Sequence, residues 1–396
     1  MTATESLNGA LPRVGAGPTT LYWYMTNTCN QRCAHCWVTA GSEFGTRAAR
    51  FEELRMFLGD AITSGLQFVK LTGGEPMIYR DFKPACDYFA ANGVKIWLET
   101  NGIRIDDEWA DYFSKVGADV GLSLDDVDPA RHDEFRGTSD SWSQTVEGAR
   151  KMLARGVTVG FTSCLTDSSL HTMADMVGLL LDEIGADSVA FNPIIPFGRA
   201  KESGGRDWRP YLDEMLARYE ELVPRYGRDR VVINLPAAFT TSAMHQRCML
   251  GDDIISILSD GSISICGFGI EDGDAVTFGD ARTQLISDLW HSHPGIQRLR
   301  TPGLGRLKGI CSNCVFSNSC RGYCRAQALA EYDDVDAPYP ICQHFAEQGL
   351  FPAHYLIDPA AEIEYKSNPA DKAFTSEILP KGLSQLRMIP LTPVSR

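Results

Sequence analysis

The chain has 396 residues, of which 44% are hydrophobic and 22% charged, a composition typical of a globular protein. Its formal net charge of −14 argues against a protein that coats nucleic acid or lies on an anionic membrane, because both surfaces attract basic side chains. No apolar run approaches the length of a membrane span, and the N-terminus lacks the order of a signal peptide. We therefore expect a cytoplasmic protein with no nucleic-acid or membrane partner.

The chain contains 12 cysteines, which gather in two groups. Three lie within residues 29–36 and seven within residues 248–342, whereas Cys86 and Cys164 stand apart. Disulfides are disfavoured in a chain without a secretion signal, because cytosolic thiols are kept reduced. Clustered cysteines in such a chain indicate metal sites.

The first half of the chain alternates short β-rich runs with helical patterns, which is typical of parallel βαβ units. The expected strands are Leu21–Met25, Phe68–Leu71, Val94–Thr100, Val120–Leu124, Val157–Leu165 and Ser188–Pro193. The expected helices are Phe51–Ser64, Asp81–Asn92, Glu108–Val116, Ser143–Arg155, Met173–Ile184 and Tyr211–Tyr226. Six such units predict an α/β fold, a partial (β/α)6 barrel with its functional residues at the C-terminal ends of the strands.

The sequence pattern changes in the second half of the chain, where short predicted strands, many glycines and closely spaced cysteines replace the alternation of strands and helices. Ile254–Leu258 and Ser262–Cys266 predict a β-hairpin. After Cys342 the chain is rich in proline and shows little periodicity. We therefore expect a disordered lead-in at 1–18, the barrel at 19–238, a cysteine-rich auxiliary domain at 239–350 and a meandering tail at 351–396.

Cys29-x3-Cys33-x2-Cys36 follows the first predicted strand directly. Three thiolates on one short loop can hold three irons of a cubane [4Fe–4S] cluster and leave the fourth iron open to a ligand. Ligation by four cysteines would instead give an electron carrier. A zinc knuckle or chance spacing is the alternative for the motif alone.

Polar and glycine-rich segments end the next three strands: Gly-Gly-Glu-Pro (73–76), Glu-Thr-Asn-Gly (99–102) and Ser-Leu-Asp (123–125). The two glycines let backbone approach a ligand closely, because no side chain intervenes. Glu75 could accept a hydrogen bond from an ammonium group, and Ser123 could bond a sugar hydroxyl. Ordinary turn glycines would explain each segment separately but not their common placement at strand ends.

This combination resembles the radical S-adenosylmethionine (radical SAM) family. The resemblance implies that Cys29, Cys33 and Cys36 hold the cluster, whose open iron is chelated by the methionine amine and carboxylate of the cofactor. His35 matches the aromatic position that flanks the adenine. The cofactor-binding residues that the resemblance implies are Gly73, Gly74, Glu75, His35, Ser123 and Asp125.

The seven later cysteines exceed one tetrahedral zinc site, whereas two cubane clusters could use up to eight thiolates. Their spacing, including Gly261, resembles the SPASM type of auxiliary domain. The resemblance implies three [4Fe–4S] clusters in all, two of them in this domain. The inner cluster would be held by Cys248, Cys266 and Cys324, and the outer cluster by Cys311, Cys314, Cys320 and Cys342.

No eighth cysteine lies within residues 249–265. The inner cluster would therefore be open to substrate or bound by a carboxylate, and metal sites do accept carboxylate ligands. The carboxylates nearby belong to Asp252, Asp253 and Asp260. Solvated loop residues are the simpler interpretation of all three.

The resemblance implies reductive cleavage of S-adenosylmethionine to a 5′-deoxyadenosyl radical, which takes a hydrogen atom from an unactivated carbon. The electron would come from a donor such as flavodoxin or ferredoxin. Auxiliary clusters could accept an electron from the substrate radical, so we expect a net oxidation. Relatives with a full SPASM domain commonly modify peptides, so we expect a ribosomally made peptide that is crosslinked or cyclised. Only about 20 residues precede the first strand, so we expect a separate leader-binding protein or a leaderless substrate.

Two alternative functions belong to classes other than peptide modification. The first is a dehydrogenase or epimerase of a small molecule such as a sugar or aminoglycoside. In an epimerase Cys164 could donate a hydrogen atom to the substrate radical, although a packed strand residue is the simpler interpretation. The second is a non-catalytic electron carrier, which would not require the segment 73–76.

Sulfatase-maturing relatives place an acidic residue directly after the second inner-cluster cysteine. This chain has Gly267 at that position, which argues against a sulfatase-maturing enzyme.

Overall fold

The computed structural model describes residues 17–38, 40–41, 48–194, 198–203, 208–239, 249, 251–267, 276–300, 306–361 and 363–378. Most of the predicted lead-in and residues 379–396 of the predicted tail therefore lie outside the described residues. None of the helices within the described ranges is long and apolar enough to span a bilayer.

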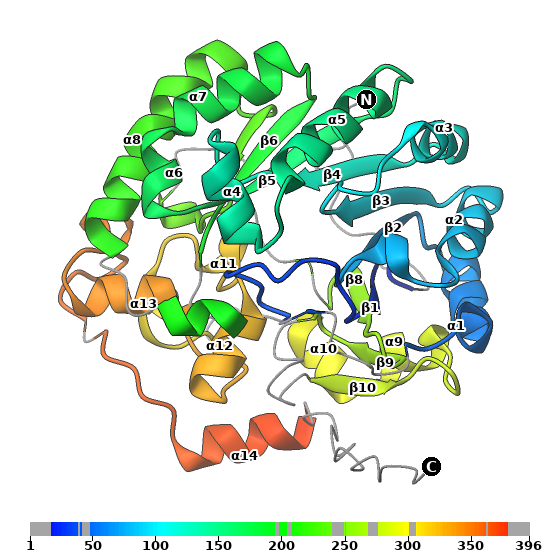
Figure 1. Ribbon diagram of the computed structural model, residues 1–396. Helices are drawn as coiled ribbons and strands as arrows, with labels where there is room; N and C mark the ends of the chain where they lie inside the picture. Colours follow the sequence, from blue (N-terminus) through cyan, green and yellow to red (C-terminus); the bar gives the residue numbers. More distant parts are fainter. Residues whose placement is uncertain are drawn as a thin grey trace, which may run out of the picture.

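Ten strands form one curved sheet in the order β10-β9-β8-β1-β2-β3-β4-β5-β6-β7 (Figure 1). The strands are β1 (Thr20–Thr26), β2 (Phe68–Gly73), β3 (Lys95–Thr100), β4 (Asp119–Ser123), β5 (Val159–Leu165), β6 (Ser188–Pro193), β7 (Val231–Ile233), β8 (Ile254–Ile257), β9 (Ser262–Ser264) and β10 (Thr277–Asp280). Neighbouring strands from β1 to β7 are parallel and follow chain order. The predicted α/β fold with an open parallel barrel is confirmed.

Helices connect these strands and cover the outer face of the sheet (Figure 1). The helices of the barrel are α1 (Phe51–Thr63), η2 (Pro76–Ile78), α2 (Phe82–Ala91), α3 (Asp107–Val116), α4 (Pro129–Arg136), α5 (Ser141–Leu153), α6 (Asp167–His171), α7 (Met173–Val177), η3 (Gly178–Glu183), η4 (Gly198–Ser203), α8 (Trp208–Tyr226) and η5 (Ala237–Phe239). Later helices are α9 (Ile286–Ser292), α10 (Pro294–Arg300), η6 (Gly309–Asn313), α11 (Ser317–Cys320), α12 (Arg325–Tyr332), α13 (Pro340–Glu347), η7 (Ala353–Tyr355) and α14 (Pro369–Ile378).

The sequence patterns do not predict helix α4, because its sequence is polar on nearly every side and lacks an apolar stripe. Its end signals are nevertheless present in the sequence. The Asp128 carboxylate accepts the backbone N–H of Ala130 at 2.8 Å, and Gly137 ends the helix with a φ of 65°. The helix matters because it carries Arg136 to the site described below.

The indole of Trp97 lies inside the barrel against two neighbouring strands. A Cβ atom on Gly121 of β4 would lie 2.9 Å from this indole, and one on Gly160 of β5 would lie 3.5 Å from it. The two glycines therefore make room for the ring, which fills that part of the barrel. Residues nearer the C-terminal ends of β4 and β5, such as Ser123 and Thr162, line an open cavity instead.

The cysteine-rich part of the chain extends the same sheet. The strand β8 pairs in parallel with β1, and β9 pairs antiparallel with β8, so the predicted hairpin is confirmed. Gly267, which directly follows Cys266, packs against Tyr24 of β1, where an added Cβ would lie 2.3 Å from the phenol ring. This contact brings Cys266 next to β1.

The tail after Cys342 contains regular structure that its sequence does not indicate. Residues Pro369–Ile378 form α14, which lies at the edge of the molecule (Figure 1). The Lys308 ammonium joins this helix to the cysteine-rich part, because its Nζ lies 2.6 Å from Asp371 and 2.8 Å from Asp334. The tail is thus attached to the cysteine-rich part by ion pairs that no periodicity could indicate.

Candidate functional site

A cavity of about 320 Å³ lies at the C-terminal ends of the barrel strands. It is lined by residues from the loop after β1 and from β2 to β6. The predicted site residues among them are Cys29, Cys33, Cys36, His35, Gly73, Gly74, Glu75, Ser123 and Cys164. The structure therefore brings these residues together, although they come from widely separated parts of the sequence.

Gly73 and Gly74 are required by the backbone of the cysteine loop. A Cβ atom on Gly74 would lie 2.2 Å from the carbonyl oxygen of Thr28, and one on Gly73, whose φ is 127°, would lie 2.6 Å from that of Thr26. The N–H of Gly74 also donates to the Thr26 carbonyl at 2.6 Å. The sequence suggests glycines that admit a ligand, but the closest approach in the structure is that of the chain itself.

Glu75 is almost fully buried, with 1% of its surface exposed. Its Oε1 accepts hydrogen bonds from the Met77 N–H at 3.0 Å and the Thr100 hydroxyl at 2.7 Å, and its Oε2 accepts one from the Asn101 N–H at 3.0 Å. Burial raises the pKa of Glu75, while these hydrogen bonds act in the opposite direction. A carboxylate oxygen can accept more than one hydrogen bond, so Oε2 retains capacity for a further donor.

Asp125 is buried behind the cavity wall and engages the protein. Its Oδ2 accepts from Arg136 Nε at 2.5 Å, and its Oδ1 accepts from the backbone N–H of Cys164 at 2.8 Å. Burial would raise the pKa of Asp125, but the Arg136 guanidinium holds it below its usual value. The same guanidinium reaches the cysteine loop, where NH1 lies 3.8 Å from Cys33 Sγ.

The His35 ring stacks on Phe135 of α4, with 4.5 Å between ring centroids and an interplanar angle of 10°. Its Nδ1 is buried and has no hydrogen-bond partner within the described residues. Burial, followed by the nearby Arg136 charge, lowers the pKa of His35 to about 3. The imidazole is therefore neutral near pH 7.

The cavity wall also carries an ion pair that sequence reasoning missed. Lys70 Nζ lies 2.5 Å from Glu99 Oε1, and the Thr72 hydroxyl donates to Glu99 Oε2 at 3.1 Å. The ammonium also lies 4.7 Å from the centroid of the Tyr22 ring. Lys70 is the one charged residue of β2, and this charge within a strand was the available signal.

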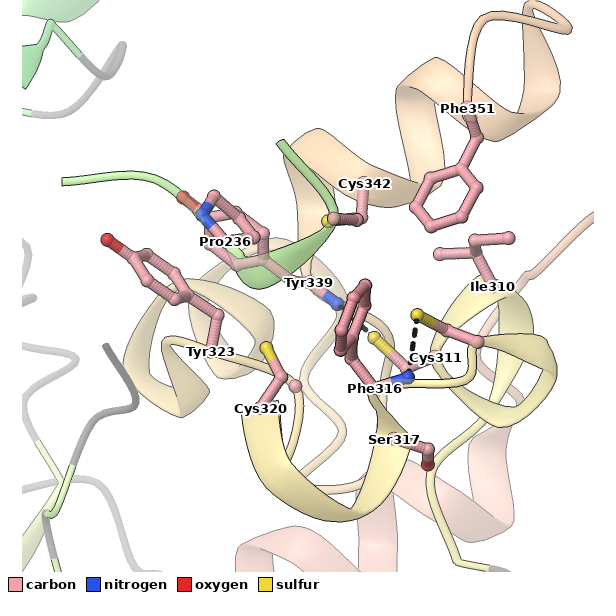
Figure 2. A pocket seen from close by; sticks show the side chains of 13 residues that line it. Pro236, Ile310, Cys311, Phe316, Ser317, Cys320, Tyr323, Tyr339, Cys342 and Phe351 are labelled. Carbon is pink, nitrogen blue, oxygen red and sulfur yellow. Dashed lines mark hydrogen bonds between the residues drawn. The ribbon is translucent and has the colours of Figure 1, made fainter. Parts of the chain in front are cut away.

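Four of the later cysteines, together with aromatic and aliphatic side chains, line a second, small pocket. Figure 2 shows Cys311, Cys320 and Cys342 with their side chains directed into this space. The fourth, Cys314, accepts the Phe316 N–H at 3.4 Å, and Cys311 accepts the Tyr339 N–H at the same distance. Burial, and then the other three thiols, raise the pKa of Cys342.

The spacing of these sulfurs distinguishes two kinds of metal site. Four sulfurs around one zinc, with Zn–S bonds of about 2.3 Å, would lie about 3.8 Å apart. In the part of the chain that the structure describes, no three cysteine sulfurs all lie within 4.8 Å of one another. Wider spacing fits a cubane, whose thiolates bind separate irons. The donor set therefore fits an iron–sulfur cluster better than a single zinc ion.

The residues predicted for the inner cluster are only partly described. Cys248 lies outside the described residues. Cys266 lies near Tyr24 and Lys70. Burial raises the pKa of Tyr24 and acts to lower that of Lys70, and in both cases the nearby Cys266 acts to raise the pKa. Cys324 directly precedes α12, and this thiol acts, after burial and Tyr323, to raise the pKa of Tyr339.

The three aspartates considered as inner-cluster ligands make contacts within the protein. Asp252 Oδ2 lies 2.5 Å from Arg321 NH1, and Asp253 Oδ1 accepts the Thr19 hydroxyl at 2.6 Å. Asp260 Oδ1 accepts the Ser262 N–H at 2.9 Å within the hairpin turn. These contacts favour structural roles for the three carboxylates.

Comparison with known proteins gives relatives along most of the chain. The chain is similar to the AdoMet-dependent heme synthase of Nitratidesulfovibrio vulgaris, with 24% identity over 81% of this chain and 91% of that protein. It is also similar to the mycofactocin maturase MftC of Mycobacterium tuberculosis, with 27% identity over 87% of this chain and 88% of that protein.

Solved structures share its fold. Streptococcus suis SuiB bound to S-adenosylmethionine has a TM-score of 0.67 and 18% identity, covering 82% of this chain and 76% of that chain. SuiB bound to the precursor peptide SuiA has a TM-score of 0.65 and 18% identity, covering 82% of this chain and 75% of that chain.

Two family models match the chain. Residues 23–180 match the radical SAM superfamily, and residues 248–315 match SPASM, an iron–sulfur cluster-binding domain. The second match includes Cys311 and Cys314 and ends before Cys320. These domains imply [4Fe–4S] clusters and binding of S-adenosylmethionine. The chain therefore contains a domain of the radical SAM superfamily and a SPASM domain.

Proposed function

We propose that this protein cleaves S-adenosylmethionine to a 5′-deoxyadenosyl radical and oxidatively modifies a ribosomally made peptide, for example by crosslinking or cyclisation. The observation that carries the proposal is the cavity, which gathers the three cysteines of the first loop with Gly74 and Glu75. The similarity to a maturase supports a peptide substrate.

Three [4Fe–4S] clusters are proposed. Cys29, Cys33 and Cys36 hold the first; Cys248, Cys266 and Cys324 hold the inner auxiliary cluster; and Cys311, Cys314, Cys320 and Cys342 hold the outer one. When bound, the first cluster and S-adenosylmethionine supply the radical that removes a hydrogen atom from the substrate. The proposed cofactor contacts are Gly73, Gly74, Glu75, His35 and Ser123, and Asp125 is proposed to act on the cofactor through Arg136.

The wall of the cavity carries groups that can bind the cofactor and orient a substrate. Glu75 Oε2 has capacity to accept an ammonium N–H, and the His35 ring, held flat against Phe135, can contact an aromatic group. The Lys70–Glu99 pair can orient a polar substrate group. Because Lys70 lies near Cys266, that group would be held on the side of the inner auxiliary cluster.

The proposed partners are a peptide substrate and an electron donor such as flavodoxin or ferredoxin, with a separate leader-binding protein unless the substrate is leaderless. SuiB, which shares this fold, has been solved bound to its precursor peptide, and this supports peptide access to a barrel of this kind. The acidic chain, with a net charge of −14, would favour encounter with a cationic peptide.

A small-molecule substrate is the second candidate. The similarity to a heme synthase over 81% of the chain favours it. Oxidation or epimerisation of a sugar or aminoglycoside belongs to the same class. In the epimerase case Cys164, which lines the cavity, would be the hydrogen-atom donor.

The two candidates can be separated with reconstituted enzyme. The enzyme is loaded with iron and sulfide without oxygen, mixed with S-adenosylmethionine and reductant, and supplied with peptide or small-molecule fractions of a host extract. Stimulation of 5′-deoxyadenosine formation by the peptide fraction, with a product that has lost hydrogen, supports peptide oxidation. Stimulation by the small-molecule fraction alone would replace the first proposal with the second.

A further inference from the structure

Arg199 joins the segment after β6 to the first cysteine loop. Its Nε donates to the carbonyl of Cys33 at 2.7 Å, and its NH1 donates to that of Ala40 at 2.9 Å. Its backbone N–H donates to the Cys36 carbonyl at 3.1 Å. One residue therefore binds three carbonyls of a loop that is distant in the sequence, with separations of 166 positions from Cys33 and 159 from Ala40.

Arg199 also helps to line the cavity described above. Arg199 NH2 is buried and makes no hydrogen bond within the described residues. Arg136, by contrast, is neutralised by Asp125. Buried donors are normally hydrogen-bonded, so an acceptor or anion for this NH2 group is expected from whatever fills the cavity.

We propose that Arg199 is the positioning residue and counter-ion of the first cluster, which rests on the function proposed above. A doubly positive cubane core bound by three thiolates has a net negative charge, and one-electron reduction makes it more negative. The guanidinium would fix the loop through the Cys33 and Ala40 carbonyls. Its charge would stabilise the reduced cluster and raise its midpoint potential.

Two substitutions separate these contributions. Arg199→Gln removes the charge but retains a hydrogen-bond donor, whereas Arg199→Lys retains the charge but loses the two-carbonyl fork. The matched control is Arg225→Gln, since Arg225 is exposed on α8 and pairs with Asp182. Each reconstituted protein is assayed for bound iron, for the rate of iron release to a chelator, and for the midpoint potential of the first cluster, first without and then with S-adenosylmethionine.

We expect Arg199→Gln to shift the midpoint potential to more negative values and Arg199→Lys to leave it near that of the unchanged protein. Both should release iron faster, and Arg225→Gln should do neither. Unchanged potential and iron release in Arg199→Gln would overturn the proposal. An effect seen only with S-adenosylmethionine present would also overturn it, because the cofactor carboxylate would then be the anion. If the unchanged protein holds no cluster at the first loop, the proposed function itself fails.

Discussion

The Thr100 hydroxyl at the end of β3 donates a hydrogen bond to Glu75 Oε1 beyond the end of β2, with 2.7 Å between the oxygens. The next backbone N–H, that of Asn101, donates to the other carboxylate oxygen at 3.0 Å. One buried carboxylate therefore connects two strand ends that form the cavity wall. Its proposed role in cofactor binding and its role in folding are carried by the same two oxygens.

Glu75→Gln should weaken both roles. The amide would place an N–H group against donors that now face oxygen, and a buried unsatisfied polar group costs about 1–3 kcal/mol. We expect a lower unfolding temperature and weaker binding of S-adenosylmethionine, measured by calorimetry and equilibrium dialysis. Glu147→Gln, at an exposed position on α5, is the control. Unchanged stability and affinity in Glu75→Gln would contradict this role.

Gly74→Ala should displace the cysteine loop, because the new Cβ would lie 2.2 Å from the Thr28 carbonyl oxygen. We expect loss of the iron held by the first loop, measured as iron per chain after reconstitution. Gly178→Ala is a matched control, since a Cβ there meets nothing within 4 Å. Full iron content in Gly74→Ala would show that the loop tolerates the contact.

Cys342→Ala should remove a ligand of the outer auxiliary cluster. If three clusters of equal size are present, loss of one lowers the iron content by about one third. Cys86→Ala should keep all of its iron, because Cys86 is a buried core residue of α2. Equal iron content in the two variants would argue against a cluster in the pocket of Figure 2.

Stability should depend on pH through His132, whose pKa is lowered to about 4, mainly by burial. The unfolded chain binds a proton near pH 6.5, whereas the folded chain does not until about pH 4, so stability falls as the pH decreases through this window. Within this window, His132 changes the free energy of unfolding by about 1.4 kcal/mol per pH unit. His132→Gln should reduce the slope of the unfolding free energy against pH by the equivalent of about one proton. Anaerobic denaturation between these pH values measures this slope. An unchanged slope would show that His132 is not responsible.

Cys164→Ala tests whether this thiol donates a hydrogen atom. Burial, followed by the Asp125 charge, raises the pKa of Cys164, so the sulfur keeps its proton near pH 7. The proposed oxidation does not use that hydrogen, and we expect the same product and stereochemistry from the variant, determined by mass spectrometry and chiral analysis. Loss of an epimerised product would instead favour the epimerase alternative.

Much of the barrel could be predicted because its strands are apolar and its motifs are local. The loop at 29–36 and the segment at 73–76 are each recognisable by residue type and spacing. Their meeting at one cavity follows from the geometry of parallel strands, whose C-terminal ends share one edge. These relations depend on periodicity and topology, both of which can be read from the sequence.

Other features depend on side-chain contacts between distant segments. Arg199 binds the loop that follows β1, and Lys70 meets Glu99 on a neighbouring strand. The resemblance places Asp125 at the cofactor, yet Arg136 of the unpredicted α4 engages its carboxylate. No local sequence pattern specifies such pairs. The sequence predicts where each helix or strand begins and ends, whereas the pairs depend on how these elements pack against one another.

The most direct test of the proposed chemistry compares the unchanged protein with a variant in which Cys29, Cys33 and Cys36 are all alanine. Both are reconstituted without oxygen and incubated with S-adenosylmethionine and reductant, and 5′-deoxyadenosine is quantified. We predict its formation by the unchanged protein, increased by the peptide fraction, and none above background from the variant. Equal amounts from both proteins, or none from a fully iron-loaded unchanged protein, would contradict the account.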